Sequence, residues 1–154
     1  SLDERSVNDL LRSFTSDPGA APIAAHRDEI DRCFAGDSVE AILASLERED
    51  TDWARTQLKY LAHKSPTALK LTFRQLRLGP TIESIADIMK MEYRMAHRTY
   101  RGVELFEGIR AVVIDKDGVP QWQPDNLAAV SEDDLNEYFV PAPGEPDFSQ
   151  AELS

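Results

Sequence analysis

Apolar residues recur along most of this chain with the spacing of an α-helix. The first such stripe lies over residues 4–14 at positions i, i+3, i+4 and i+7, and comprises Val7, Leu10, Leu11 and Phe14. The same spacing predicts helices over residues 26–34 and 51–63, and a helix that follows Asp37 as its cap. The periodicity therefore indicates a helical protein.

Residues suited to helix ends mark the boundaries of two longer helices. Ser65 can accept a hydrogen bond from a free N–H of the first turn, and Pro66 suits the first helical position because it has no N–H. Gly79 ends this helix, and Thr81 is expected to cap the longest helix, over residues 81–100. The expected inner stripe of that helix is Ile82, Ile85, Ala86, Met89, Tyr93 and Ala96, widened by Ile88, Met91 and Met95.

The apolar run over residues 103–114 fits either a helix or a strand. The segment Ala111–Ile114 has the composition of a strand, but no partner strand is evident elsewhere, and an isolated strand leaves its backbone groups unpaired. Helix is therefore preferred. A turn follows over residues 115–118, and Ser131 is expected to cap a last helix that ends at Phe139.

These elements predict an all-α fold of about seven helices, packed around the long helix over residues 81–100 as its centre. Residues 1–139 are expected to form one helical region. Residues 140–154 are rich in proline and acidic residues, which predicts a disordered acidic tail.

Charge and composition narrow the classes of partner. Seventeen basic and 28 acidic side chains give a net charge of −11, which disfavours nucleic acid and anionic lipid as partners. The chain has no apolar run near the roughly 18 to 20 residues that cross a bilayer and no signal-peptide pattern at its start, so a cytoplasmic location is expected. The single cysteine, Cys33, is expected to be a buried, unreactive thiol.

Candidate catalytic and metal-binding groups are few. The three histidines, His26, His63 and His97, lack the close spacing of a zinc site, so no specific metal site is expected. The glycines are separated along the chain and fit turns and helix ends better than an oxyanion-binding loop. Glu107 has no partner that spacing identifies for acid–base work, and it is interpreted as a first-turn helix residue.

Two groups of basic residues lie at helical spacing. Lys70, Arg74 and Arg77 share a face that can meet phosphates, although a solvated face near a helix C-terminus is the preferred interpretation. The second group is Arg94, Arg98 and Arg101. These residues are expected to interact favourably with the C-terminal dipole of the long helix, or to pair with acidic residues across an interface.

Several short motifs occur in one order from residue 65 onward. They are Ser65-Pro66-Thr67, Leu71-Thr72-Phe73-Arg74-Gln75-Leu76, Met91-Glu92-Tyr93-Arg94, Glu107-Gly108-Ile109-Arg110-Ala111-Val112, Ile114-Asp115-Lys116-Asp117, Trp122-Gln123-Pro124 and Glu132-Asp133-Asp134-Leu135-Asn136. In these motifs the chain resembles the helical C-terminal portion of the 3-hydroxyisobutyryl-CoA hydrolases, a branch of the crotonase (enoyl-CoA hydratase/isomerase) superfamily. The resemblance extends over residues 4–139 and is weaker before Cys33.

The resemblance implies that the complete protein hydrolyses 3-hydroxyisobutyryl-CoA in valine degradation, without a metal or redox cofactor. That family holds the thioester carbonyl with two backbone N–H groups and uses carboxylates, all from an N-terminal core that is not found in this sequence. The chain alone is therefore expected to be inactive. The complete protein would bind its acyl-CoA substrate through that core. The resemblance also allows for a homo-oligomer. In related proteins the chain after the corresponding helix lies near the coenzyme, which makes Lys116 a candidate coenzyme A contact, beside the plainer interpretation of a charged turn.

Two alternatives remain open. The complete protein could instead be an enoyl-CoA hydratase or isomerase, since the helical portion does not specify the reaction. The chain could also be an autonomous helical interaction module, and this alternative predicts that its apolar surface is fully covered, whereas a portion of an enzyme should expose a large apolar patch.

Overall fold

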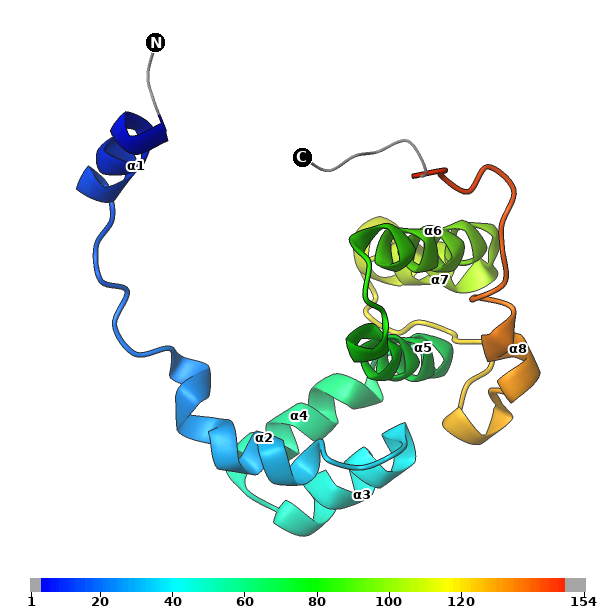
Figure 1. Cartoon of the computed structure of the whole chain (residues 1–154). Helices are drawn as coiled ribbons and strands as arrows, with labels where there is room; N and C mark the ends of the chain where they lie inside the picture. The colour runs from blue at the N-terminus through cyan, green and yellow to red at the C-terminus, as the bar shows by residue number, and fades with distance from the viewer. Residues whose placement is uncertain (1–3, 149–154) are drawn as a thin grey trace.

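The computed structural model describes residues 4–148, and every regular element within that range is a helix (Figure 1). The α-helices are α1 (Glu4–Ser13), α2 (Arg27–Cys33), α3 (Val39–Glu49), α4 (Asp52–Ala62), α5 (Pro66–Leu78), α6 (Ile85–Arg101), α7 (Val103–Ile109) and α8 (Glu132–Asn136). Shorter turns are the 3₁₀-helices η1 (Pro22–His26), η2 (Gly79–Thr81) and η4 (Leu127–Ala129), and the π-helix η3 (Arg110–Ile114). The predicted all-α class is confirmed.

The apolar run after Gly102 is helical throughout, as preferred from the sequence. Helix α7 continues directly into η3, so the strand considered for residues 111–114 does not form. The helical hydrogen bonds thereby pair backbone groups within the run itself, which a single strand cannot do.

Side-chain caps fix several helix starts. The hydroxyl of Ser65 accepts from the N–H of Ala68 at 3.0 Å, with Pro66 in the first position of α5, as predicted. Ser131 likewise caps α8, although α8 ends at Asn136 rather than Phe139.

Two predicted caps lie at neighbouring positions instead. Ser38, not Asp37, accepts from Ala41 at the start of α3. Ser84, not Thr81, caps α6, since Thr81 belongs to the short turn η2. Aspartate, serine and threonine are all favoured at a helix N-cap, so where several occur close together the chain path between helices decides which one is used.

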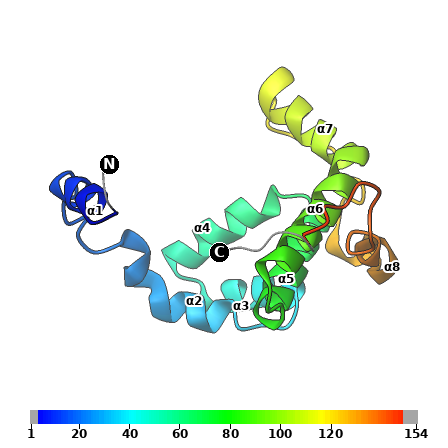
Figure 2. The same ribbon diagram turned by 45° about the horizontal axis from the view of Figure 1, so that its top comes forward.

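The buried apolar residues form two clusters, and α5 contributes to both. The first cluster comprises Cys33, Ile42, Leu46 and Ala54, with Trp53, Leu58, Leu61 and Phe73 packed against it. The second comprises Leu71, Val130 and Leu135, with Met95, Tyr138 and Phe139 packed against it. In Figures 1 and 2, α5 accordingly lies between the α2–α4 group and α6. The helix shared by the two clusters is α5, not the long helix α6 that the sequence favoured as the centre.

Helix α6 is covered on one side only. Met91 is buried and Met95 packs on the second cluster, whereas Ile85 and Met89 of the predicted inner stripe are 67% and 48% exposed. Part of the stripe expected to face the core is therefore open, whereas Tyr93 of the same stripe contacts the segment after residue 140. Both stripes are apolar, so periodicity alone does not rank them.

The segment from residue 140 to 148 is held against α6, which corrects the prediction of a disordered tail for this part. The Tyr93 hydroxyl donates to the carbonyl of Pro143 at 2.9 Å, and Arg94 binds Glu145 through two nitrogens at 2.7 and 2.6 Å. The rest of the predicted tail lies outside the described residues.

Helix α1 lies apart from the other helices at the end of an extended segment (Figures 1 and 2). Its predicted apolar stripe is exposed, and Phe14 just after it is 81% exposed. Within the described residues, no helix is both long and apolar enough to pass through a bilayer.

Candidate functional site

A groove of about 990 Å³ lies between the start of α5, the end of α6 and α7. Its walls are mainly apolar, from Leu71, Val103, Leu105, Ile109, Val112, Val113, Trp122 and Val130. Polar groups enter at one end, where the Ser65 hydroxyl donates to a Glu104 carboxylate oxygen at 2.9 Å. A groove of this kind can receive another apolar surface or an elongated ligand.

The helix that borders the groove, α7 with η3, exposes apolar side chains on more than one side. The exposed fractions are 68% for Val103, 55% for Phe106, 68% for Val112, 56% for Val113 and 69% for Ile114. An apolar surface of this extent marks an interaction site in a soluble protein. We call these five residues the α7–η3 surface.

Just beyond this surface, Arg110 gathers three carboxylates around the turn over residues 115–118. Its guanidinium binds Glu107 through two nitrogens at 2.9 and 2.8 Å, Asp115 at 2.8 Å and Asp117 at 2.7 Å. Glu107 also accepts from the backbone N–H of Gln121 at 2.6 Å. One cation therefore joins the end of α7, the turn and the segment that follows.

These contacts move the pKa values of the groups involved. Hydrogen bonds from Arg110 and from the Gln121 backbone lower the pKa of Glu107 from 4.5 to about 2. The hydrogen bond from Arg110 also lowers the pKa of Asp117. Glu107 is thus a poor proton acceptor near neutral pH. It is the fifth residue of α7 and a partner of Arg110, which corrects its interpretation as a first-turn residue.

The candidate coenzyme contact, Lys116, lies at the tip of this turn. It adopts a left-handed backbone conformation with φ of 56°, and its side chain is exposed, with no ion pair or hydrogen bond to any described residue. Its two acidic neighbours, Asp115 and Asp117, are both bound by Arg110. The ammonium group of Lys116 is therefore presented to solvent without a competing carboxylate in contact with it.

Trp122 anchors the segment after the turn. Its indole N–H donates to the carbonyl of His63 at 3.3 Å, and its ring lies against Gly108, where an added Cβ would meet it at 3.2 Å. Gly108 thus permits close contact between α7 and this tryptophan.

The histidines do not converge. His26 contacts Glu29 at 2.6 Å and stacks on Trp53, while His97 stacks on Tyr93. Among residues 4–148 no three metal-ligating side chains come together. The positive φ values of Gly19, Gly118 and Gly144 agree with glycines in turns.

Comparison with known proteins shows to which family this chain belongs. The sequence profile described as enoyl-CoA hydratase/isomerase matches residues 1–139. The chain belongs to the enoyl-CoA hydratase/isomerase family. Among curated proteins, mitochondrial 3-hydroxyisobutyryl-CoA hydrolase of Homo sapiens is 42% identical over 114 residues, which are 74% of this chain and 29% of the human protein. The Gallus gallus hydrolase is 41% identical over 146 residues, covering 92% of this chain and 38% of that protein.

Solved structures of this enoyl-CoA hydratase/isomerase family match in fold as well. A carnitinyl-CoA dehydratase from Mycobacterium thermoresistibile aligns with a TM-score of 0.85 and 34% identity, covering 95% of this chain and 42% of that chain. An enoyl-CoA hydratase from Rhodobacter sphaeroides 2.4.1 aligns with a TM-score of 0.71 and 36% identity, covering 90% and 43%. The chain thus spans about a third of the length of the curated relatives, 29% and 38% of the two above.

Sequence reasoning missed two polar groups of this region. It assigned Arg94 to the helix dipole or to acids across an interface, whereas Arg94 binds Glu145 of the same chain, 51 residues away. It also overlooked Arg110, whose spacing of three, five and seven residues from Glu107, Asp115 and Asp117 was a usable signal. For the Arg94 pair, no spacing in the sequence points to the partner.

Proposed function

We propose that this chain is the C-terminal, non-catalytic portion of a 3-hydroxyisobutyryl-CoA hydrolase. In this proposal the complete protein cleaves the thioester of 3-hydroxyisobutyryl-CoA in valine degradation, and the chemistry resides in an N-terminal core. The observation that carries the proposal is the 42% identity to a curated 3-hydroxyisobutyryl-CoA hydrolase over 74% of this chain.

The α7–η3 surface supports the structural part of the proposal. Its five side chains are each more than half exposed, which is typical of an apolar surface that another domain or subunit covers. The core would seat on this surface and on the adjacent groove of about 990 Å³. The autonomous module, which requires a covered apolar surface, is disfavoured for the same reason.

Thiol release tests the proposal directly. The complete protein should release coenzyme A from 3-hydroxyisobutyryl-CoA, followed with a thiol-reactive chromophore, while the 154-residue chain alone should give the buffer rate. Thiol release by the chain alone contradicts the non-catalytic role.

A second candidate is an enoyl-CoA hydratase or dehydratase, favoured by the 0.85 TM-score to a carnitinyl-CoA dehydratase. The complete protein would then change the absorbance of an enoyl thioester without releasing thiol. Measuring both signals on the same preparation distinguishes the two reactions.

Three further parts of the proposal rest on the sequence. Lys116 contacts the coenzyme, the complete protein forms a homo-oligomer, and it resides in the cytoplasm. The relatives named above are mitochondrial by name, so fractionation of cells that express the complete protein tests the location, and light scattering tests the oligomer.

A further inference from the structure

A second groove, of about 360 Å³, lies on another part of α5 and shares no lining residue with the first. Its walls come from the start of α3, one face of α5 and the start of α8. The three basic residues at helical spacing, Lys70, Arg74 and Arg77, line it. Lys70 pairs with Glu40 of α3 and Arg74 lies near Glu132 of α8, so these two are only partly solvated. Arg77 donates to the loop before α3 and is exposed, as expected from the sequence.

Arg74 has an unmet donor in this groove. Its Nη1 atom is buried and has no hydrogen-bond partner among the described residues. The nearest carboxylate oxygen, on Glu132, is 3.8 Å away, which is beyond hydrogen-bond distance, and the guanidinium carbon lies 4.8 Å from the Phe139 ring centroid. The Arg74 side chain as a whole is 33% exposed, so the guanidinium borders the groove and a ligand there can supply the acceptor that Nη1 lacks.

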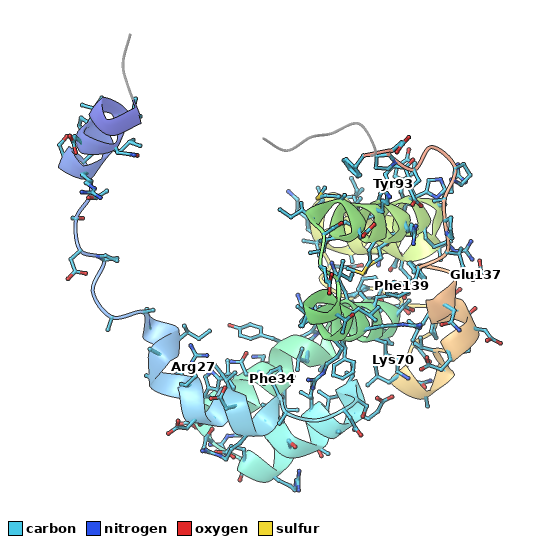
Figure 3. The ribbon with its side chains drawn as sticks, viewed as in Figure 1. Arg27, Phe34, Lys70, Tyr93, Glu137 and Phe139 are labelled. Atoms are coloured by element: carbon cyan, nitrogen blue, oxygen red, sulfur yellow. The ribbon has the colours of Figure 1, made fainter. Side chains whose placement is uncertain are left out.

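Lys70 lies near Arg74 on the same helix face, and Figure 3 shows it on the side of α5 toward α3 and α8. Its ammonium group is 3.0 Å from Glu40, with the lysine side chain 17% and the glutamate side chain 48% exposed. Burial raises the pKa of Glu40, but hydrogen bonds from its own backbone N–H and from Lys70 outweigh this and lower it. The cation is thus fixed in the groove, while its counter-ion remains accessible to water.

The first turn of α3 completes the groove. Residues 37–40 line it, and Ser38 caps the helix by accepting from Ala41. The positive end of an 11-residue helix therefore adds to the two cations. Arg77 is already committed, since it donates to the carbonyl of Gly36 at 2.5 Å and lies over the Phe73 ring.

We propose that this second groove binds a phosphoryl group, with Arg74 and Lys70 as its cationic ligands and Glu132 as the carboxylate it displaces. Three acids, Asp37, Glu40 and Glu132, balance the three cations in the free groove. Glu132 is 79% exposed and makes no hydrogen bond to Arg74, so it can move into water when an anion arrives. A phosphoryl group carries enough acceptors to satisfy Arg74 and Lys70 together. The site is independent of the proposed hydrolase function.

The test is a titration of the full chain with sodium phosphate at constant ionic strength, followed by NMR of the Arg74 side chain and the α3 amides. Arg74→Gln should weaken binding at least about tenfold, since it removes charge-assisted hydrogen bonds. Glu132→Gln should tighten binding about two- to fivefold, because it removes the competing charge. Arg98→Gln is the matched control, as Arg98 is a half-exposed arginine of α6, 3.5 Å from Glu137, and should leave binding unchanged.

Two further ligands identify the source of the phosphoryl group. Tighter binding of glycerol 3-phosphate than of phosphate supports a phosphomonoester, and weaker binding supports free phosphate. Acetate should bind worse than either, and equal affinity for acetate overturns the phosphoryl assignment. The proposal is also overturned by equal phosphate affinity in the wild type and Arg74→Gln, or in the wild type and Glu132→Gln. Because Glu132 is exposed, Glu132→Gln should fold, so its comparison with the wild type tests the proposal even if Arg74→Gln does not fold.

Discussion

Arg110 shows how one side chain can organise a turn that the sequence marks only as charged. It binds the carboxylates of Glu107, Asp115 and Asp117 and also donates to the carbonyl of Val119 at 3.2 Å. Three acids within ten residues would repel one another without this cation. The turn around Lys116 therefore depends on Arg110 for its conformation.

The pKa of Glu107 gives a pH prediction at this scale. Its folded pKa of about 2 lies below the ordinary value of 4.5, so the ion pair contributes stability fully above pH 4.5 and loses it as the pH falls toward about 2. NMR titration of the Glu107 carboxyl should give a midpoint near 2 in the wild type and a clearly higher one in Arg110→Gln, which stays below 4.5 because the hydrogen bond from the Gln121 backbone remains. Equal midpoints would show that Arg110 is not the cause.

Lys116→Gln tests the coenzyme contact and rests on the proposed function. In the complete protein, loss of one ion pair to a phosphate should raise KM for the thioester about three- to tenfold with kcat unchanged. Lys59→Gln is the control, because Lys59 is an exposed lysine of α4 away from the turn. A KM that stays at the wild-type value in Lys116→Gln removes Lys116 from the site.

At the scale of elements, the residue that caps the start of α5 also makes a contact with another helix. Ser65 is buried, caps α5 and donates to Glu104 of α7, so a single hydroxyl fixes the two helices that frame the first groove. Ser84 caps α6 in the same way, but it is bound only to Asp87 of its own helix.

Substituting these two serines separates the cap from the helix–helix contact. Ser84→Ala should cost about 1 kcal/mol of unfolding free energy, the usual loss of a cap. Ser65→Ala should cost about 2 kcal/mol, since it also leaves Glu104 without its donor. Urea unfolding measures both. Equal losses would mean that the Ser65–Glu104 hydrogen bond contributes nothing.

The segment over residues 140–148 is held against α6 by the Arg94–Glu145 ion pair and by the hydrogen bond from Tyr93 to Pro143. The side chains of Arg94 and Glu145 are only 26% and 18% exposed, which limits the screening of their contact by solvent. Arg94→Ala should release the segment and speed its cleavage by proteases several-fold, whereas Arg101→Ala, an exposed arginine of the same helix, should not. Cleavage at the wild-type rate in Arg94→Ala would contradict this role.

At the scale of the whole molecule, the exposed α7–η3 surface decides between a self-sufficient domain and part of a larger body. Apolar side chains more than half exposed at five positions along one short stretch are unfavourable in water unless another surface covers them. Ile85 and Met89 of α6, which are 67% and 48% exposed, add a second uncovered region.

Dye binding tests this expectation. The chain alone should enhance the fluorescence of a dye that binds apolar surface, and the double substitution Val113→Ser with Ile114→Ser should reduce the signal by roughly half, since it removes a substantial part of the α7–η3 surface. Tyr60→Ser is the control, because Tyr60 is 62% exposed on α4, outside that surface. If the chain does not enhance the fluorescence of the dye, the chain is a self-sufficient domain and the expectation is wrong.

The sequence alone determined the helical class, most helix boundaries and the caps at Ser65 and Ser131, because these depend on periodicity and on hydrogen bonds within a few residues. Local patterns contain this information because the interacting groups are close along the chain. The family resemblance, rather than a local pattern, made Lys116 a candidate coenzyme contact, and that lysine lies in an exposed turn.

Only the tertiary structure decided which helix is shared by the two clusters, which stripe of α6 is covered, and what binds Arg94 and Arg74. Each of these depends on partners that are distant along the chain, as with Arg94 and Glu145, whose separation is 51. Two apolar stripes of one helix, or several acids in one tail, are equivalent in sequence until packing brings one of them into contact.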